Sequence, residues 1–268
     1  MKLGYNKYLR KYKKLMPTED GSVTLFSEEF KESYHSTHDG ALHESLNKHV
    51  IPAFSFQKDK KELTILDICF GLGYNSLATI YYIKKENLKT KVHILSPEFD
   101  KELIESLSTF EYPKEFNNLK DIIIELSHNF YYEDEQFKIE ILLGDARVSI
   151  PQIKQKIDII YQDAFSPKRN PLLWTKEYFA DIKALCKKDT ILTTYSIAIA
   201  VRMGLYENGF NIFISKGDRV RPYTIASPTI LADLKYIDME LKKSRNLEAR
   251  SLKDSDFYEP LTLKKLQM

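Results

Sequence analysis

Short apolar runs alternate with helix-compatible stretches over most of this chain, starting at residue 63. The run 63–68 (LTILDI) has the length and the branched apolar residues of a buried parallel strand. It leads into the turn Gly71-Leu72-Gly73 and then into residues 75–84, whose spacing fits a helix. A strand, a glycine turn and a helix in this order open many nucleotide-type ligand sites, because glycines let a ligand approach the backbone closely. A plain strand-to-helix turn stays open as the alternative, because Ser76 replaces the third glycine of the dinucleotide fingerprint.

The same alternation continues toward the C-terminus and predicts the fold class. Six further apolar runs fit strands, the last two as a closing antiparallel pair: residues 91–95, 137–143, 157–161, 190–195, 210–215 and 223–226. Helices fit residues 174–187 and 197–208, and Gly209 ends the second of them. This order is typical of an α/β, Rossmann-like fold with a mostly parallel seven-stranded sheet and helices on both faces.

The two ends of the chain differ from this central part. Residues 21–26 alternate well enough for a strand, and residues 30–50 have helical character. The first 20 residues are basic and aromatic, and they form either an ordered arm or a frayed end. Residues 235–265 are so charged that we expect only a partial helix there. We divide the chain into an N-terminal extension, a main domain and a charged C-terminal extension: residues 1–60, 61–230 and 231–268.

Composition narrows the function classes only a little. The aromatic share of 12% argues against global disorder, and a net charge of +2 with a pI of about 8.2 neither favours nor excludes nucleic acid. Cys69 and Cys186 are far apart and indicate neither a zinc knuckle nor a disulfide framework. No apolar run reaches membrane-span length and a signal-peptide core is missing, so we expect a cytoplasmic protein without a membrane partner. The cations gather in two groups: Lys2, Lys7, Arg10, Lys11, Lys13 and Lys14, interleaved with Tyr5, Tyr8 and Tyr12, and then Lys216, Arg219 and Arg221.

Four histidines within fifteen residues raise the question of a metal site. They are His35, His38, His43 and His49. Their spacings of three, five and six residues do not repeat on one helical face, and no cysteine lies nearby. We therefore expect ordinary polar contacts or substrate contacts for them, and no metal.

An acidic residue ends or follows each of four successive predicted strands: Asp67, Glu98, Asp145 and Asp163. Ligands of a doubly wound sheet bind beyond the carboxyl ends of its strands, so we expect these side chains at one site. A carboxylate after the second strand can accept both ribose hydroxyls of an adenosine, and one after the third can accept from the adenine amine. Asp67 can orient the turn or meet an ammonium group. Each acid can also be a helix N-cap, and this alternative stays open for Asp67 and Asp163.

Several segments carry a resemblance to a known family. They are DGSVTLFS with YHSTHDGALHES (residues 20–45), FGLGYN (70–75), GDAR (144–147), DAFSPKRNPLLWT (163–175) and YSIAIAVRMGLYENGF (195–210). On these segments the chain resembles the class I methyltransferases that use S-adenosylmethionine, and more closely the tRNA 5-(aminomethyl)-2-thiouridine methyltransferases. The resemblance covers about residues 18–225, and its most specific block is 163–175. Cys69 stands where the family has a glycine, and the oxidase half of the family's bifunctional form has no counterpart here.

The resemblance implies a class I methyltransferase fold, S-adenosylmethionine as cofactor and a tRNA bound by its anticodon stem-loop, which the basic residues 1–16 could grip. It implies Asp163 as the catalytic acid and Phe165 beside the substrate pocket. Phe165, Trp174 or Tyr195 could stack on the base, and each can equally belong to the core. The implied cofactor-binding residues are Asp67, Gly71, Gly73, Asn75, Glu98, Asp145 and Ala146, with Tyr34, Ser36 and Glu44 in a segment that closes over the cofactor. The implied contacts to RNA phosphate are Lys168, Arg169, Arg202, Arg219 and Arg221, each of which can equally be a solvated surface cation.

The implied reaction is N-methylation of 5-aminomethyl(-2-thio)uridine at the wobble position, to 5-methylaminomethyl(-2-thio)uridine. A separate upstream tRNA-modification enzyme would make the aminomethyl substrate. An ionised Asp163 favours the ammonium form, which helps binding and opposes nucleophilicity, so we expect Asp163 to align the amine and relay its proton. Three alternatives remain: an aminopropyltransferase similar to the polyamine synthases, a nicotinamide-dependent oxidoreductase, and a catalytically silent adenosyl-binding RNA-recognition module. The missing third glycine and the extra acid Asp145 count against the oxidoreductase, and Asp163 counts against the silent module.

Overall fold

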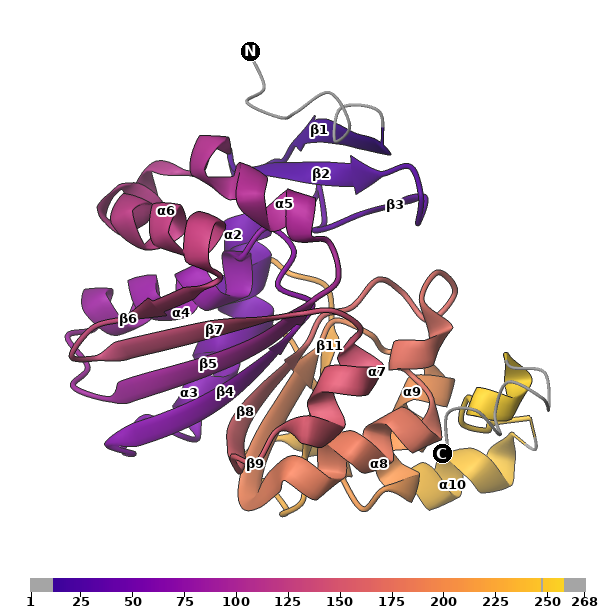
Figure 1. Ribbon diagram of the computed structural model, residues 1–268. Coiled ribbons are helices and arrows are strands. Elements are labelled where there is room, and N and C mark those ends of the chain that lie inside the picture. The colour runs from indigo at the N-terminus through magenta and orange to yellow at the C-terminus, as the bar shows by residue number, and fades with distance from the viewer. Residues whose placement is uncertain (1–11, 247, 258–268) are drawn as a thin grey trace.

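A nine-stranded sheet forms the centre of the computed structural model, which describes residues 12–246 and 248–257 (Figure 1). Its strand order is β12-β10-β11-β9-β8-β4-β5-β7-β6. The five strands from β9 to β7 are parallel, whereas β6, β10, β11 and β12 are antiparallel to their neighbours. The strands are β4 (Glu62–Ile68), β5 (Lys91–Glu98), β6 (Tyr131–Glu133), β7 (Phe137–Leu143), β8 (Ile157–Gln162), β9 (Cys186–Thr194), β10 (Asn211–Ser215), β11 (Tyr223–Ser227) and β12 (Lys235–Tyr236).

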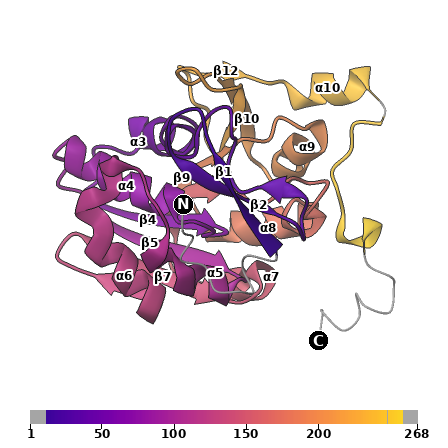
Figure 2. The same ribbon diagram turned by 90° about the horizontal axis from the view of Figure 1, so that it is seen from above.

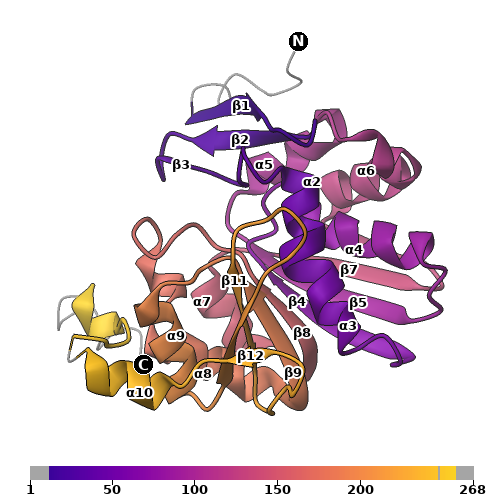
Figure 3. The ribbon, with the colours of Figure 1, turned by 180° about the vertical axis from the view of Figure 1, so that it is seen from behind.

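Helices cover both faces of this sheet, and each face buries its own apolar layer. The helices are α2 (Ala41–Glu44), the π-helical η1 (Ser45–Val50), α3 (Ile51–Ser55), α4 (Tyr74–Lys85), α5 (Lys101–Ser106), α6 (Lys120–Asn129), α7 (Ala146–Ser149), α8 (Lys176–Leu185), α9 (Ile199–Glu207) and α10 (Met239–Arg245), with 3₁₀ turns η2 (Leu107–Thr109), η3 (Lys114–Leu119), η4 (Ile150–Gln152), η5 (Pro171–Leu173) and η6 (Asp254–Asp256). In β4, the neighbours Ile65 and Leu66 are both fully buried on opposite faces, as the two-residue period of a strand requires. Ile65 packs in a core with α3, α4 and α6, and Leu66 packs in a core with α7, α8 and α9. Figure 3 shows where these helices lie around the sheet.

A second, three-stranded antiparallel sheet lies over the carboxyl ends of the central strands (Figures 1 and 2). It consists of β1 (Lys13–Pro17), β2 (Val23–Ser27) and β3 (Glu32–Ser33). Lys13 forms an ion pair with Asp100 just after β5, and the Tyr74 hydroxyl at the start of α4 donates to the Val23 carbonyl at 2.8 Å. These contacts hold β1 and β2 against the main sheet. For the first 20 residues, the sequence had left two alternatives open, an ordered arm and a frayed end. Residues 1–11, with the cations Lys2, Lys7, Arg10 and Lys11, lie outside the described residues.

The helix predicted over residues 30–50 is wrong in its first part. There the chain runs beside β2 instead, and the Tyr34 N–H donates to the Leu25 carbonyl at 2.8 Å. The helix begins only after Gly40, whose φ is +86° and where a Cβ would lie 2.1 Å from Asp20 Cγ. Glycine is required there because the Asp20 side chain occupies the space next to its Cα. From Gly40 the helix continues through α2, η1 and α3, beyond the predicted end.

All seven strands predicted for the central sheet are present, the strand predicted over residues 21–26 is β2, and the α/β fold class with a mostly parallel sheet is confirmed. The sheet is wider than predicted because β6 and β12 add a short strand at each edge. The partial helix expected in the charged C-terminal stretch is α10. Among the residues that the structure describes, no helix combines the length and the apolar character needed to cross a bilayer. The proposed division into residues 1–60, 61–230 and 231–268 stays a prediction.

Candidate active site

A cavity of about 630 Å³ opens at the carboxyl ends of β4, β5, β7 and β8, under the small sheet. Small-molecule sites have volumes of roughly 300–1,000 Å³ and occur at this end of doubly wound sheets. The predicted site residues that line it are Tyr34, Ser36, Glu44, Gly71, Asn75, Glu98, Asp145, Ala146, Asp163, Phe165, Tyr195 and Arg221. Three of the four strand-end acids therefore meet at one cavity, together with the N-terminal segment.

The turn after β4 has three residues at positive φ: Cys69 at +65°, Gly71 at +54° and Gly73 at +73°. The Gly71 N–H donates to Glu98 Oε2 at 2.8 Å, which ties this turn to the end of β5. A Cβ at Gly71 would lie 3.1 Å from the Tyr34 ring, and one at Gly73 would lie 2.7 Å from a phenylalanine ring. Both positions therefore require glycine. Gly71 lines the cavity, whereas Gly73 only shapes the turn.

Asp67 lies under this turn and not on the cavity wall. Its side chain is buried, with Oδ2 accepting from the Ser76 hydroxyl at 2.7 Å and Oδ1 from the Asn75 amide at 3.4 Å. Burial, with a contribution from the charge of Asp163, raises the pKa of Asp67 to about 7 despite these hydrogen bonds. Asp67 thus fixes the start of α4 and orients Asn75. It does not line the cavity itself, so we expect it to act on a ligand only through Asn75 and the turn.

Two carboxylates stand at the ends of β5 and β7. Glu98 is buried, and its two oxygens accept from the backbone N–H groups of Gly71 and Asp100, at 2.8 Å each. Burial raises the pKa of Glu98, although these backbone hydrogen bonds oppose the shift. Asp145 is the N-cap of α7, with Oδ1 accepting from the Arg147 N–H at 2.8 Å. Each carboxylate still has lone pairs left for a ligand, since a carboxylate accepts up to about four hydrogen bonds.

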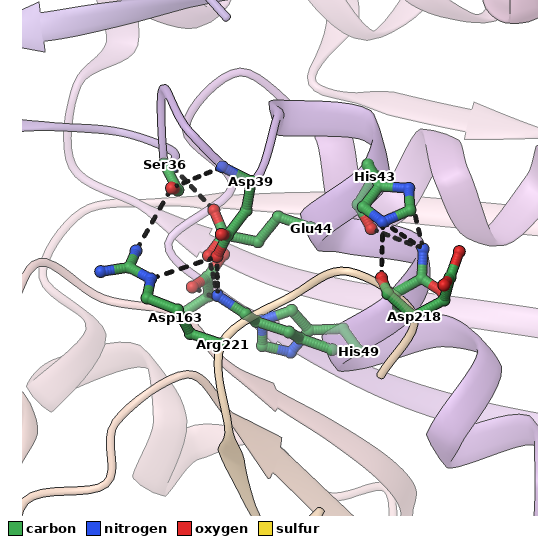
Figure 4. A network of polar contacts seen from close by, with 10 residues as sticks. Ser36, Asp39, His43, Glu44, His49, Asp163, Asp218 and Arg221 are labelled. Carbon is green, nitrogen blue, oxygen red and sulfur yellow. Dashed lines mark hydrogen bonds and ion pairs between the residues drawn. The ribbon is translucent and has the colours of Figure 1, made fainter. Parts of the chain in front are cut away.

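Asp163 follows β8 and is held from two sides. Its Oδ2 accepts from Asn75 Nδ2 at 2.9 Å. On the other side, its Oδ1 lies 3.5 Å from His49 Nε2, and Figure 4 shows these two residues. Burial acts to raise the pKa of Asp163, but the nearby imidazole groups of His49 and His35 and the hydrogen bond from Asn75 outweigh it and hold the pKa below its usual range. Asp163 is therefore ionised at neutral pH, on the wall of the cavity.

The two histidines beside Asp163 were not predicted as site residues. His35 lines the cavity, packs edge-on against the Tyr74 ring at a centroid distance of 5.0 Å, and burial lowers its pKa. His49 contacts β9, where its Nδ1 lies 2.9 Å from Thr193 Oγ1. The sequence contained one signal for both, the four-histidine segment, for which we expected ordinary polar contacts or substrate contacts. Among the described residues, no group of three or more His, Cys, Asp or Glu side chains is arranged so that it could hold a metal ion.

A buried ion cluster fixes the segment that closes the cavity on the N-terminal side (Figure 4). Lys48 lies between Asp39 and Glu44, with its Nζ 2.6 Å from an oxygen of each. Glu44 also accepts from the Ser36 N–H at 2.8 Å. Arg221 joins from the loop after β10, 3.2 Å from Ser36 Oγ and 3.4 Å from an Asp39 oxygen. This arrangement holds Glu44 and Ser36 at the cavity wall and occupies part of the Arg221 guanidinium.

An aromatic cluster covers the other side of the cavity. The Phe165 ring stacks on Phe30 at a centroid distance of 4.6 Å and meets the Tyr34 ring edge-on at 4.9 Å. Next to it, Glu32 of β3 accepts from the Ser166 N–H at 3.0 Å and from its hydroxyl at 2.8 Å. The loop that carries Asp163 is thereby fastened to the small sheet.

Comparison with known proteins identifies the family. The family model for an S-adenosyl-L-methionine-dependent methyltransferase matches residues 111–228. The crystal structure of MNMC2 from Aquifex aeolicus is 33% identical, and the match covers 93% of this chain and 81% of the other with a TM-score of 0.80. This chain belongs to the MnmC2 family.

Curated relatives of this MnmC2-family protein are longer than the chain. An uncharacterised protein of Methanocaldococcus jannaschii is 33% identical over 210 residues, which are 77% of this chain and 56% of that protein. The tRNA 5-methylaminomethyl-2-thiouridine biosynthesis bifunctional protein MnmC of Leptospira interrogans is 29% identical over 213 residues, 74% of this chain and 32% of that protein. The chain thus spans about half of the first relative and a third of the second.

As a member of this family, the protein is an S-adenosylmethionine-dependent methyltransferase, and its cavity fits that cofactor. The turn at Gly71 brings bare backbone to the wall, and Glu98 and Asp145 offer carboxylate oxygens to hydroxyl and amino groups. Phe99, which sequence reasoning missed, lines the cavity next to Glu98 with 80% of its side chain exposed. An exposed ring in that position can cover the face of an adenine.

Several predicted substrate residues of the MnmC2-family chain lie away from the cavity. Trp174 is fully buried and donates from Nε1 to the Phe165 carbonyl at 2.8 Å, so of the two alternatives for it, stacking on the base or a place in the core, the structure shows the core. Arg202 donates from Nε to Thr224 Oγ1 at 3.0 Å, and burial lowers its pKa. Its Nη2 is buried without a hydrogen-bond partner in the described part of the chain, a position unsuited to a surface phosphate contact. Three of the residues predicted to contact RNA phosphate are exposed and lie outside the cavity lining: Lys168, Arg169 and Arg219.

Proposed function

We propose that this protein transfers a methyl group from S-adenosylmethionine to the primary amine of 5-aminomethyl(-2-thio)uridine at the wobble position of tRNA. The product would be 5-methylaminomethyl(-2-thio)uridine. The single observation that carries the proposal is an ionised carboxylate, Asp163, held at the wall of a cavity that also exposes the rings of Phe165 and Tyr195. The name of the Leptospira interrogans relative supports the same class of substrate.

The residues of the β4, β5 and β7 turns would hold the cofactor. When bound, S-adenosylmethionine supplies a methyl group on a positively charged sulfur, and this carbon–sulfur bond breaks with its electron pair left on sulfur as the nitrogen–carbon bond forms. Glu98 would accept from the ribose hydroxyls and Asp145 from the adenine amine, while the backbone at Gly71 and the Asn75 side chain would hold the methionine part. Alignment of the amine with the methyl group would supply much of the rate.

Asp163 would hold the amine of the substrate. An alkylamine is largely protonated at neutral pH, and an ionised carboxylate attracts this ammonium form into the cavity. The nitrogen becomes a nucleophile only after it has lost a proton, so Asp163 would also have to pass that proton on. The flanking rings of Phe165 and Tyr195 offer stacking faces for a pyrimidine that has been rotated out of the anticodon loop.

The RNA backbone would lie along the exposed cations outside the cavity. Lys168 and Arg169 are exposed and belong to the same loop as Asp163, and Arg219 is 83% exposed at its side chain. Arg221 would contribute only in part, because it already contacts Ser36. Cations in such positions bind backbone phosphates regardless of the RNA sequence, and they make the affinity for tRNA dependent on salt concentration.

The proposed function is tested with purified protein, methyl-labelled S-adenosylmethionine and bulk tRNA from cells that lack this gene. Nucleoside analysis should find the label in 5-methylaminomethyl(-2-thio)uridine. Label in a different nucleoside would refute the substrate. Transfer of an aminopropyl group to putrescine from the decarboxylated cofactor would favour the aminopropyltransferase alternative instead. An upstream enzyme that makes the aminomethyl group would have to be active in those cells.

A further inference from the structure

His49 is buried next to Asp163, and one of its ring nitrogens faces this acid without forming a hydrogen bond. Only 1% of its side chain is exposed, and it extends from η1 toward the loop after β8 (Figure 4). Its Nε2 lies 3.5 Å from Asp163 Oδ1 and has no hydrogen-bond partner among residues 12–246 and 248–257. A buried polar nitrogen left without a partner costs free energy, so its position facing the acid of the site calls for an explanation.

The contact on the other side of the ring allows Nε2 to take up a proton. Nδ1 lies 2.9 Å from the hydroxyl oxygen of Thr193 on β9. When Nδ1–H donates to this hydroxyl, the neutral ring has its lone pair on Nε2, on the side of Asp163. Protonation of Nε2 then leaves the Thr193 hydrogen bond unchanged and creates a donor that points to a carboxylate. His49 can therefore change its charge without moving.

We propose that His49 is a positioning residue that accepts, through Asp163, the proton which the substrate amine loses before methyl transfer. This inference rests on the proposed function. The ammonium group first lies against the ionised Asp163, with His49 neutral. The proton moves from the nitrogen to Asp163 and on to His49 Nε2, so the amine gains its lone pair, Asp163 stays an anion and His49 becomes a cation. After the product leaves, the proton returns to water through Asp163, whose side chain is 10% exposed.

An imidazole is the better acceptor for this proton. The pKa of an ordinary imidazole is about 6.5, against about 3.9 for an ordinary aspartate. Even an ordinary aspartate is a much weaker base than an alkylamine, so the carboxylate alone would leave the proton on the amine. Moving the proton one residue further also keeps a negative charge beside the amine N–H groups, which holds the lone pair in one direction.

We assign the proton transfer to Asp163 and His49 and not to the other titratable groups around His49. Tyr161 of β8 presents its ring at a centroid distance of 5.6 Å, and burial raises its pKa. His35 has a pKa lowered by burial, and Asp67 has a pKa of about 7 for the same physical reason. The neighbouring Lys48 directs its ammonium group to the ion cluster with Asp39 and Glu44. Among the described residues, Asp163 is the one acid within ion-pair distance of His49.

The kinetic test compares His49→Gln with the wild-type chain from about pH 6 to pH 9, with tRNA that carries 5-aminomethyluridine. We expect kcat near pH 7 to fall by about 100-fold or more, as for loss of a positioned acid–base group. The KM for the cofactor should stay nearly constant, and the deficit in kcat should shrink with rising pH as water takes the proton instead. A deficit that is the same at every pH, or no deficit, would overturn the inference.

Two further variants separate this role from a structural one. His49→Asn keeps an amide near Thr193 but lacks the second ring nitrogen, and it should show the same pH-dependent deficit. His93→Gln is the matched control, because His93 also pairs with a carboxylate, Glu140 at 2.6 Å, and lies outside the cavity lining. Its kcat should equal that of the wild type at each pH. Unequal behaviour of the two His49 variants would assign the effect to packing.

Histidine-ring NMR tests the pair without any substrate. The His49 signal is assigned by its absence from the spectrum of His49→Gln. The chemical shift of its Nε2 should change in Asp163→Asn, because Asp163 Oδ1 lies 3.5 Å from that nitrogen. An unchanged shift in an enzyme that methylates tRNA would overturn the inference alone. A changed shift in a protein that methylates no tRNA would overturn the proposed function, and with it the amine as source of the proton.

Discussion

Replacing Asp163 by asparagine removes a charge and keeps the size of the side chain. The native carboxylate accepts from Asn75 Nδ2 at 2.9 Å and lies 3.5 Å from His49 Nε2. An asparagine oxygen can keep the contact to Asn75, but an amide neither attracts an ammonium group nor takes up its proton. A positioned acid–base group contributes about 10²–10⁴-fold to a rate, which corresponds to about 3–5 kcal/mol of transition-state free energy. We therefore expect Asp163→Asn to lower kcat by about that factor.

The assay for Asp163→Asn is steady-state methylation of tRNA together with calorimetric titration of the cofactor. Cofactor affinity should change little, because Glu98 and Asp145 are untouched. Asp189→Asn is the matched control: Asp189 is exposed, pairs with Lys60 at 2.7 Å and lies outside the cavity lining, so its loss should leave kcat unchanged. Full activity in Asp163→Asn would refute the reasoning. A loss of cofactor affinity as large as the loss of kcat would show that Asp163 acts on the cofactor instead.

Lys48→Met should lower the free energy of unfolding by about 3–5 kcal/mol, because two buried carboxylates lose their partner; a loss below about 1 kcal/mol in urea denaturation would contradict this. Asp67 has a pKa raised to about 7 in the folded state, so its stabilising contribution is complete below about pH 4 and is lost as the pH rises to about 7. Asp67→Asn should flatten that decline, which is on the order of 4 kcal/mol, and an unchanged pH slope in urea denaturation would show that the pKa is not raised. The double variant Lys168→Ala/Arg169→Ala should weaken tRNA binding and reduce the slope of log K against log salt by about 1 to 2, whereas parallel salt curves would remove both cations from the RNA interface.

The seven inner strands of the central sheet could be predicted because each of them carries the evidence for its own burial in its sequence. The run 137–143 matches β7 residue for residue, since apolar branched side chains bounded by polar turns define a strand locally. The edge strands β6 and β12 have only three and two residues, and their pairing depends on the neighbouring strand instead of their own pattern. Gly40 explains the misplaced helix start, because the approach of Asp20 to its Cα is a tertiary contact.

The candidate site could be predicted as far as it is built from strand ends. Glu98, Asp145 and Asp163 meet at one cavity because parallel strands end at the same edge. His49 could not be predicted as their neighbour, because 144 residues separate it from its contact Thr193 and only the packing of η1 against β9 brings them together. The burial of Trp174 could not be predicted either, because the sequence around an aromatic residue in a loop does not show whether the ring stacks on a ligand or packs in the core.

The proposed reaction places the methyl group on the amine of a modified wobble uridine. It is tested with a synthetic anticodon stem-loop that carries 5-aminomethyluridine, methyl-labelled S-adenosylmethionine and mass spectrometry of the released nucleosides. We expect one labelled methyl group on the amine, as 5-methylaminomethyluridine, and no label in the same stem-loop with unmodified uridine. Equal labelling of both stem-loops, or no label although the cofactor binds, would refute the proposed function.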